Sequence, residues 1–382
     1  MKKKISILGS TGSIGETTLK IILKKKKLFK VNILAANKNY KKICNQITIF
    51  KPNYFIVNDF KTFLKVKKFA KKKKTKILNK INFQKKSIKN DISISAIPGI
   101  AGLSSTIYFA KHSKKLLIAN KESIICGWDI LVSTIKKSKT KLIPIDSEHF
   151  SLLKLLEISK KEDVKKIFIT ASGGPFFKSN INLNNIKPRQ ALRHPKWSMG
   201  KKISIDSATM MNKIFELTEA KKLFPFFKDK IGILIHPQSL VHAVVVYKNG
   251  LTNMLYHKPN MIIPISNAIF DSKIDITDFY KTNDNFSNLQ FYEINKKNFF
   301  PYKILDKINL YKSSPIIVNA VNEILVDQFL KRKISFLSII DYISRVFKDK
   351  NYKKYAIKTP NNIKEIYKID NWARSKAKSL LK

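Results

Sequence analysis

The sequence predicts an α/β protein with an N-terminal parallel sheet, a central α+β region and a C-terminal helical bundle. Three observations support this prediction. Short apolar runs alternate with amphipathic segments up to residue 146, which is typical of parallel strands joined by helices. Strand-like and helical segments are mixed over residues 167–270, and long segments with a helical period follow residue 301.

The chain opens with an apolar run at residues 5–8, a glycine-rich turn at residues 9–15 and an amphipathic segment at residues 16–23. A strand, a glycine turn and a helix in this order form the phosphate loop of Rossmann-like dinucleotide-binding domains. The helix N-terminus supplies N–H donors to a pyrophosphate. Because the spacing is G-x-x-G-x-x-G, a variant of the usual fingerprint, an ordinary glycine turn stays open as the alternative.

The second strand is expected at residues 31–36, and Asn37, Lys38 and Asn39 follow it. A site for NAD would carry an acid here for the ribose. An acid would repel a 2′-phosphate, whereas a cation and amides accept one. This turn therefore favours NADP over NAD, with a plain polar turn as the alternative.

Further strands are expected at residues 92–97, 116–119 and 142–145, and the lysine-rich stretch 61–90 is expected to form a solvated helix and loops. Asn120 and Lys121 directly follow one of these strands. Residues just past the carboxyl ends of parallel strands face the ligand crevice, so we expect both to meet a cofactor or substrate.

Acids are scarce, which makes their positions informative. Asp146 and Glu148 lie two residues apart at the end of a strand, and Glu216 lies on a helix predicted over residues 209–224. Three carboxylates without a Cys or His ligand pattern suit a hard divalent ion, Mg²⁺ or Mn²⁺. A helix cap and two surface acids are the alternative.

The same helix carries a polar face. Asp206 and Ser207 are predicted to cap its N-terminus, and Asn212 and Lys213 share a face with Glu216 at spacings of four and three residues. Ser207, Asn212 and Lys213 together suit an anion beside the metal. Ordinary capping chemistry is the alternative.

Two loops also have the composition of binding loops. Residues 172–175, Ser-Gly-Gly-Pro, offer exposed N–H groups that suit a phosphate, although an ordinary turn explains them equally. Residues 193–200 contain His194, Trp197 and Met199. We expect this second loop to act as a lid that excludes water, with packing in the core as the alternative.

Composition excludes several classes of protein. The 382 residues contain 44% hydrophobic residues, which excludes a wholly disordered chain. The chain has 75 Lys and Arg residues and 26 Asp and Glu residues. Only five of the 75 basic residues are Arg, although proteins that recognise bases and phosphates favour Arg over Lys. The net charge of +49 therefore indicates drift toward A/T-rich codons, with selected basicity left open.

Two distant cysteines, Cys44 and Cys126, exclude a disulfide framework. We expect a cytoplasmic protein with no specific nucleic-acid partner and no membrane partner.

Together these motifs resemble the 1-deoxy-D-xylulose 5-phosphate reductoisomerase family. The resemblance runs in order through residues 9–15, 119–123, 144–149, 172–176, 193–200, 206–213 with Glu216, and 236–239, with weaker similarity at residues 319–323. It covers essentially the full length. It implies an NADPH-dependent enzyme of non-mevalonate isoprenoid biosynthesis, usually a homodimer, that needs Mg²⁺ or Mn²⁺. The substrate skeleton is rearranged to an aldehyde, which NADPH reduces to 2-C-methyl-D-erythritol 4-phosphate.

The resemblance also implies domains and residue roles. The domains are an NADPH-binding domain at 1–146, a catalytic and dimerisation domain at 147–270, a linker at 271–300 and a helical domain at 301–382. The metal ligands are Asp146, Glu148 and Glu216; the catalytic residues are Lys121, Glu148 and His194. The substrate contacts are Lys121, Ser147, Glu148, Ser172, His194, Ser207, Asn212, Lys213 and Glu216. The NADPH contacts are Thr11, Gly12, Ser13, Ile14, Asn37, Lys38, Asn39, Asn120, Glu122 and Gly200, and Trp197 and Met199 belong to the lid.

Some positions depart from the family pattern. Asn37 stands where glycine is usual, Asn260 and Ile262 replace an acid and an arginine, and Asn249 replaces an acid. None of them removes an implied metal or phosphate ligand. Two other hypotheses stay open at this point: another NADP-linked reductase of a small phosphorylated carbonyl, and a basic nucleic-acid-binding protein.

Overall fold

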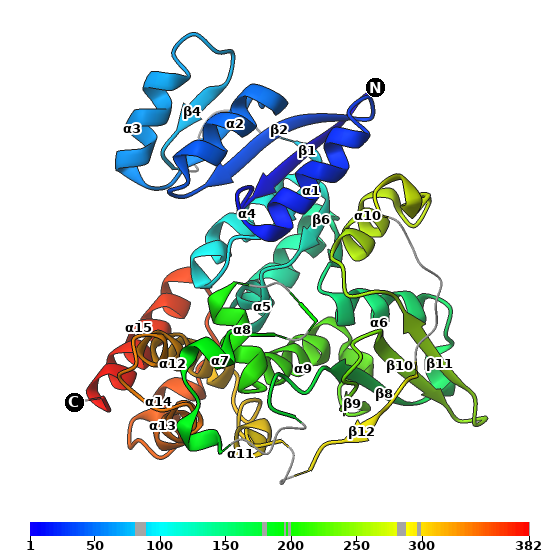
Figure 1. The fold of residues 1–382 in the computed structure, drawn as a ribbon, viewed down its shortest axis with the longest axis vertical. Coiled ribbons are helices and arrows are strands. Elements are labelled where there is room, and N and C mark those ends of the chain that lie inside the picture. The colour runs from blue at the N-terminus through cyan, green and yellow to red at the C-terminus, as the bar shows by residue number, and fades with distance from the viewer. Residues whose placement is uncertain are drawn as a thin grey trace. The chain divides into compact units, whose positions relative to one another are not determined.

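The computed structural model describes residues 1–80, 89–177, 182–194, 196–197, 200–280, 288–295 and 299–381 (Figure 1). The chain forms two compact units. Unit 1 comprises Met1–Ser123, Asp129–Phe150 and Asn260–Asn285, and unit 2 comprises Ile124–Trp128, Ser151–Pro259 and Phe286–Lys382. Each unit is therefore assembled from segments that lie far apart in the sequence.

Unit 1 is built on a sheet in which every described strand is parallel to its neighbours, in the order β4-β3-β2-β1-β5-β6-β7. The strands are β1 (Lys3–Leu8), β2 (Phe29–Ala36), β3 (Tyr54–Val57), β4 (Lys76–Leu78), β5 (Asn90–Ser95), β6 (Ser113–Ile118) and β7 (Lys141–Pro144). The predicted α/β class is confirmed. The short strands β3 and β4 were not expected, and residues 81–88 of the lysine-rich stretch lie outside the described part of the chain.

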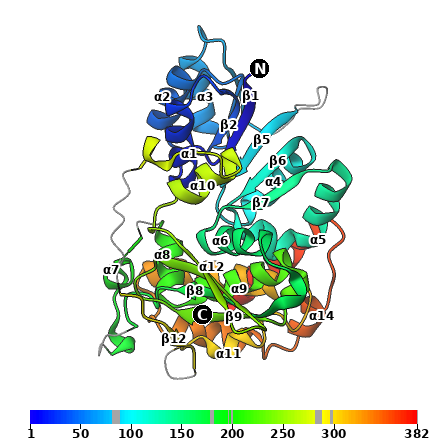
Figure 2. The same cartoon turned by 90° about the vertical axis from the view of Figure 1, so that its right-hand side faces the viewer.

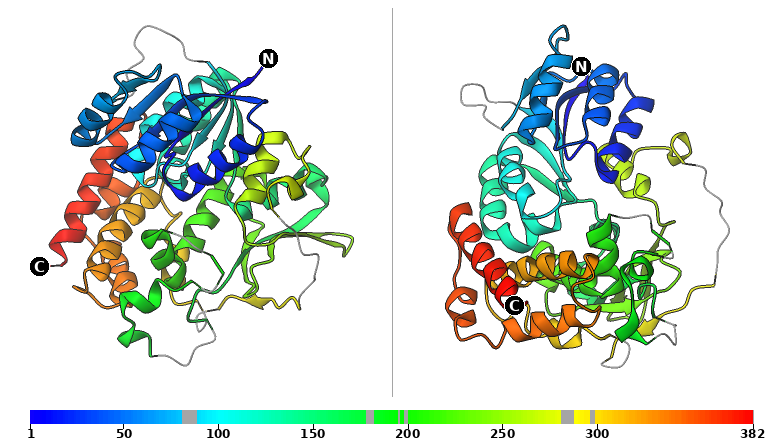
Figure 3. Two further views of the ribbon diagram at one scale, coloured as in Figure 1. Left: turned by 45° about the horizontal axis from the view of Figure 1, so that its top comes forward. Right: turned by 60° about the vertical axis from the view of Figure 1, so that its left-hand side comes forward.

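Helices join these strands, as the alternation in the sequence predicts. They are α1 (Ser13–Lys24), α2 (Tyr40–Phe50), α3 (Phe60–Phe69), η1 (Ile100–Gly102), α4 (Leu103–Lys111), α5 (Lys121–Ser138) and the start of α6 (Ser147–Glu157). Right-handed crossovers put the helices that follow β1 to β3 on one face and those that follow β5 and β6 on the other, and Figure 3 shows the blue and cyan helices on opposite sides of the strands. The strand order thus reverses between β1 and β5, the position where such sheets bind ligands.

A segment from much later in the chain completes unit 1. Helix α10 (Ile262–Phe270) packs against α1 (Figure 2), and the ring of Phe270 meets the ring of Phe29 edge-on with 5.6 Å between centroids. Just beyond it, Asp271 accepts a 2.7 Å bond from Lys115, and Asp278 in η5 (Ile276–Asp278) lies 2.7 Å from Lys25. The expected domain limits stay predictions. The two compact units have other boundaries than the predicted domains, because α10 and the residues after it pack against α1 and the parallel sheet.

Unit 2 combines a mixed sheet with a helical region. Its described strands, in the order β11-β10-β8-β9-β12, are β8 (Val164–Ala171), β9 (Ile231–Ile235), β10 (Val241–Tyr247), β11 (Thr252–Tyr256) and β12 (Tyr292–Glu293). Its helices are η2 (Lys161–Asp163), η3 (Leu183–Asn185), α7 (Pro188–Ala191), α8 (Lys201–Ala208), α9 (Met211–Leu223), η4 (Pro225–Phe227), α11 (Tyr302–Leu305), α12 (Ser314–Leu330), α13 (Ser338–Val346), α14 (Tyr352–Ala356) and α15 (Ile363–Ser379). The expected helical C-terminal region is confirmed.

The helical region has a core of aromatic rings and an ionic tie between α12 and α15. Arg374 of α15 donates a 2.6 Å bond to Asp370 and pairs with Glu323 of α12, and these carboxylates raise the pKa of the guanidinium further above its usual range. Phe336, which is 0% exposed, meets the rings of Phe176 and Phe329 edge-on at 5.5 and 5.7 Å between centroids.

We therefore predict that Phe336→Ala lowers the free energy of unfolding by about 3–5 kcal/mol, because it removes a buried ring and leaves a cavity. The matched change Phe226→Ala, at a phenylalanine that is 59% exposed in the same unit, should cost well under half as much. Urea unfolding followed by circular dichroism measures both. Equal losses in the two variants would contradict the role of this core.

Candidate active site

The glycine turn after β1 has a backbone that only glycine allows. Gly9 has a φ of +87°, and a Cβ there would collide with the carbonyl oxygen of Ala96 after β5. A Cβ on Gly15 would collide with the carbonyl oxygen of Gly9. The loops after β1 and β5 therefore touch at the position where the strand order reverses.

Helix α1 begins inside this turn. Its N-cap is Gly12, whose N–H donates to the Gly9 carbonyl over 3.1 Å. The first N–H groups of a helix have no acceptor within it, so the amides from Ser13 onward are available to an anion. Thr11, Gly12, Ser13 and Ile14 are the expected cofactor contacts, and all four are partly or fully exposed.

Two other expected cofactor segments also follow strands of this sheet. Asn37, Lys38 and Asn39 form the exposed turn between β2 and α2, and the Asn39 side chain caps α2 by accepting from the Lys42 amide at 3.2 Å. Asn120 is buried at the end of β6. Its amide nitrogen donates to the Ile97 carbonyl at 2.7 Å and to Glu122 at 2.9 Å. Asn120 thus ties the loop after β6 to the loop after β5.

The carboxylates expected in unit 1 lie at the end of β7 and in the first turn of α6. Lys121, at the start of α5, lies 2.6 Å from the Oδ2 of Asp146. Glu148 accepts a hydrogen bond from the hydroxyl of Ser147. His149 is fully buried with its Nδ1 3.5 Å from the Oδ1 of Asp146. No role was predicted for His149 from the sequence, although Asp146 and His149 lie three residues apart at the start of a helix and could be expected to meet.

The prediction that Asp206 and Ser207 cap the helix bearing Glu216 is wrong. Both belong to the last turn of a separate helix, α8, and α9 begins at Met211 after Met210, which has a φ of +61°. Asp206 is 1% exposed. Its carboxylate accepts from Asn322 of α12 at 2.7 Å and lies 2.9 Å from Lys202. The side chain therefore braces α8 against α12 and is unavailable as a cap.

The shared face on α9 is confirmed. Asn212 donates a 2.6 Å bond to the Oε1 of Glu216, and Lys213 forms an ion pair with its Oε2. Lys213 and Glu216 are both buried. A buried carboxylate without a partner would carry a large desolvation cost, which the ion pair with Lys213 offsets.

Ser172 and His194 form a hydrogen-bonded pair in the same unit. The Nδ1 of His194 lies 3.2 and 3.0 Å from the amides of Lys196 and Trp197, so it accepts and the proton sits on Nε2. Nε2 then donates to the Oγ of Ser172 over 3.1 Å, and the Gly174 amide donates to the same oxygen over 3.1 Å. With two donors on its oxygen, the Ser172 hydroxyl is oriented to donate its own proton to a ligand.

This serine loop packs against the end of α8. Gly174 has a φ of +72°, and a Cβ on it would lie 2.8 Å from the carbonyl oxygen of Ser207. The close approach brings the 172–174 loop beside the turn that leads to Asn212 and Lys213. The expected phosphate contacts in unit 2 therefore come from two adjoining segments.

Part of the expected lid is described. The ring of Trp197 meets the ring of His242 edge-on at 6.2 Å between centroids, and Gly200 is the exposed N-cap of α8. Pro195, Ser198 and Met199 lie outside the described residues. The place of Met199 in the lid stays a prediction.

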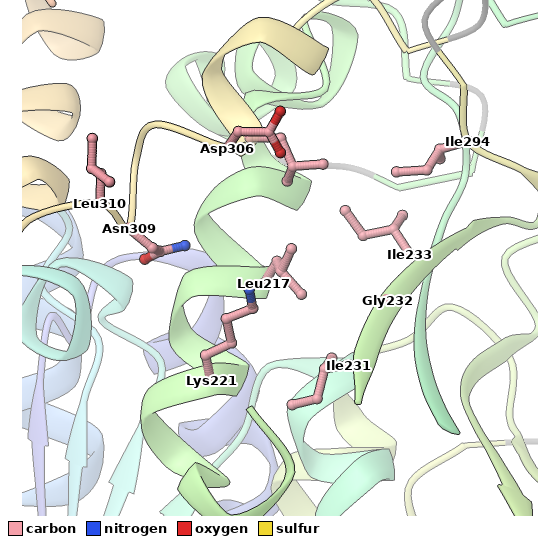
Figure 4. Close-up of a pocket in the computed structure, with 10 residues that line it drawn as sticks. Leu217, Lys221, Ile231, Gly232, Ile233, Ile294, Asp306, Asn309 and Leu310 are labelled. Carbon is pink, nitrogen blue, oxygen red and sulfur yellow. The ribbon is translucent and has the colours of Figure 1, made fainter. Parts of the chain in front are cut away.

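A hollow of about 530 Å³ lies elsewhere on unit 2 (Figure 4). Its lining includes Leu217 and Lys221 of α9, Ile233 of β9 and Asp306 after α11. None of the predicted site residues lines it. The chemistry of the chain is therefore expected at the strand ends and helix starts described above.

The departures from the family pattern have local structural roles. The side chain of Asn260 accepts at 2.9 Å from the amide of Ile262, the first residue of α10, which is an Asx-turn contact that an aspartate would also make. Asn249 accepts from the Leu251 amide at 3.0 Å in the turn between β10 and β11. Asn37 is exposed in its turn.

The fold and the relatives below define a class of protein, an NADP-dependent oxidoreductase, here with a parallel α/β unit and a second unit that carries polar loops and a buried acid. Family descriptions match along most of the chain. Residues 5–127 match 1-deoxy-D-xylulose 5-phosphate reductoisomerase, and residues 142–224 and 257–376 match C-terminal domains of the same enzyme.

Relatives match over the full length. The chain is 44% identical to the 1-deoxy-D-xylulose 5-phosphate reductoisomerase of Pelagibacter ubique, with 99% of each chain covered, and 37% identical to that of Wolbachia pipientis, covering 100% of this chain and 98% of the relative. The solved Zymomonas mobilis enzyme in complex with NADPH is 28% identical with a TM-score of 0.87 and full coverage of both chains. A reductoisomerase solved with NADPH, fosmidomycin and magnesium is 30% identical with a TM-score of 0.90, covering 99% of this chain and 98% of that one.

The chain belongs to the 1-deoxy-D-xylulose 5-phosphate reductoisomerase family. The resemblance in the sequence is thereby confirmed, and neither another reductase nor a nucleic-acid-binding protein is favoured. Within the described residues, no helix combines the length and the apolar character needed to cross a membrane.

Burial lowers the pKa of His194 to about 4, and we predict a neutral imidazole at pH 7. Because this pKa lies below the unfolded value of about 6.5, the contribution of His194 to stability is complete above pH 6.5 and falls as the pH drops toward 4. An NMR titration of the ring, assigned with His194→Gln, should give a midpoint near 4 in the ligand-free protein. A midpoint at or above 6.5 would contradict the hydrogen-bond assignment.

Proposed function

We propose that this chain uses NADPH and Mg²⁺ or Mn²⁺ to isomerise and reduce 1-deoxy-D-xylulose 5-phosphate to 2-C-methyl-D-erythritol 4-phosphate, a step of non-mevalonate isoprenoid biosynthesis. The observation that carries the proposal is the polar face of α9. Asn212 and Lys213 stand one turn before the buried Glu216, and the Ser172 loop packs beside them. A phosphate cradle next to a carboxylate suits a phosphorylated, metal-binding substrate.

The donor set fits a hard divalent ion. Asp146, Glu148 and Glu216 are buried or half-buried carboxylates, and oxygen ligands of this kind are those that Mg²⁺ and Mn²⁺ prefer. A bound ion would polarise the substrate carbonyl and stabilise oxyanion charge. Asp146 and Glu216 each contact a lysine, Lys121 and Lys213 respectively. We infer that these lysines balance the carboxylates when no ion is held.

The C-terminal edge of the unit 1 sheet fits NADPH. The collision that a Cβ on Gly9 would cause with Ala96 shows how tightly the turn is folded, and the free amides of α1 face the position of a pyrophosphate. Lys38 and the two flanking asparagines offer a cation and amides to the 2′-phosphate. NADPH accompanies two of the related solved structures, which supports the same cofactor here.

The remaining roles follow from the polar groups of the chain. The Ser172 hydroxyl, oriented by His194 and Gly174, donates to the substrate phosphate together with Ser207, Asn212 and Lys213. Lys121 supplies an ammonium beside the reacting oxygens, where it assists proton movement. Ser147 binds a substrate hydroxyl, and the Trp197 loop excludes water. Phosphate binding far from the reacting carbons can thus drive closure of the site.

We also infer that the enzyme is a cytoplasmic homodimer. The family resemblance supports the dimer, and a chain with two cysteines that lie far apart in the sequence fits a reducing compartment. Sedimentation equilibrium tests the dimer directly, and a monomer at all concentrations would contradict it.

The test of function follows NADPH oxidation by absorbance with 1-deoxy-D-xylulose 5-phosphate as the substrate. We expect oxidation with Mg²⁺ or Mn²⁺ and none with EDTA. Folded protein that binds NADPH and still fails to oxidise it with this substrate and either ion would sink the proposal.

We predict that Glu216→Gln lowers kcat by at least about 100-fold, because even the outer partners of metal ligands are worth about 10–100-fold. Binding of NADPH, measured by its fluorescence, should stay within about twofold of the wild type. Asp229→Asn, which removes an exposed acid in the same unit, serves as the matched control and should leave kcat unchanged. Turnover like that of the wild type in Glu216→Gln would remove Glu216 from the metal site.

A further inference from the structure

Gln46 of α2 makes two hydrogen bonds to one residue of the glycine turn. The hydroxyl of Ser10 donates to the Oε1 of Gln46 over 2.7 Å, and the Nε2 of Gln46 donates to the carbonyl oxygen of Ser10 over 2.9 Å. The two residues are 36 positions apart in the sequence. Both are buried: Gln46 is 5% exposed and Ser10 is 0% exposed. A side chain that bonds both a hydroxyl and the adjacent backbone fixes the position and the orientation of that residue.

Ser10 is held on every polar atom. Besides the two bonds to Gln46, its N–H donates over 2.9 Å to the Ala35 carbonyl, which also accepts from the Gly9 amide over 2.9 Å. The next residue, Thr11, begins the stretch of expected cofactor contacts at residues 11–14. Ser10 is therefore held in place directly before the residues that are proposed to bind NADPH.

The same glutamine belongs to the helix that follows the other cofactor turn. Helix α2 begins directly after Asn37, Lys38 and Asn39, and Asn39 caps it. The helix thus connects the turn expected at the 2′-phosphate to the turn expected at the pyrophosphate. Gln46 makes that connection through buried hydrogen bonds, which are stronger and more directional than an apolar contact.

We propose that Gln46 is a positioning residue for the cofactor: it holds the glycine turn in its binding conformation before NADPH arrives. A turn without this clamp would have to be ordered during binding, and the lost conformational entropy would weaken affinity. The proposal rests on the proposed function only in taking NADPH as the ligand of the turn. A purely structural role predicts a different result, namely a loss of stability with unchanged affinity.

The test measures the dissociation constant of NADPH by its fluorescence, without substrate or metal ion. Gln46→Met keeps the length of the side chain and removes both hydrogen bonds, so we expect affinity about tenfold weaker. Ser10→Ala removes one bond, and we expect about a threefold loss. Asn45→Met, at an exposed neighbour on the same helix, is the matched control and should bind like the wild type.

A double-mutant cycle separates positioning from general damage. In the Gln46→Met background, Ser10→Ala should have little further effect on the dissociation constant, because its partner is already gone. At saturating NADPH, kcat should stay near the wild-type value in every variant. Additive losses in the cycle, or equal affinity in Gln46→Met and wild type, would overturn the role of Gln46.

Gln46→Glu keeps the proposal testable if Gln46→Met does not fold. The carboxylate still accepts from the Ser10 hydroxyl and loses the donor to the Ser10 carbonyl, so affinity should again fall. NADPH affinity equal to that of the wild type would overturn the proposal. A wild-type protein that binds no NADPH at all would instead reject the proposed function, so the two failures are distinguishable.

Discussion

The close approach of Gly9 to the carbonyl of Ala96 is the constraint on which the first unit of this enzyme depends. No side chain fits between the two segments, so the loops after β1 and β5 can meet only through glycine. The strand order reverses at the same place, and the loops after β2, β6 and β7 lie at the same edge of the parallel sheet. Asn120 and Gln46 then fix the neighbouring loops by buried hydrogen bonds. Local backbone geometry thus determines where scattered polar residues of the first unit are collected.

The second organising feature is the pairing of rare acids with abundant lysines. Asp146 contacts Lys121, Asp206 contacts Lys202 and Glu216 contacts Lys213. In a chain with a net charge of +49, lysines are abundant near most carboxylates. The negative charge of a buried carboxylate is therefore readily compensated by a lysine without a metal ion. In the proposed function, Lys213 binds the substrate phosphate once Glu216 holds a metal ion. The basic composition is therefore compatible with a site that must hold both anions and cations.

The sequence predicted most strands and helices because their apolar residues follow the periods of buried strands and amphipathic helices. It also predicted the shared face of Asn212, Lys213 and Glu216, since helical spacing is local information. The break between α8 and α9 was missed because Met210 adopts a left-handed conformation for which methionine gives no sequence signal. The tie from Asp206 to Asn322, the packing of α10 on α1 and the clamp by Gln46 were missed for a different reason. They depend on contacts between residues far apart in the chain, which spacing does not encode.

The return of Asn260–Asn285 to the first unit has a consequence for the order of events during synthesis. A nascent chain that has reached Phe150 contains the whole parallel sheet, yet it lacks the helix that covers α1 and the aspartates that bind Lys25 and Lys115. The 135 residues from 151 to 285 require roughly 7–27 s at about 5–20 residues per second. Until α10 has been made, at Phe270, the surface of α1 that it covers stays open on the ribosome. Unit 1 is thus begun first and completed only when about half of unit 2 has been translated.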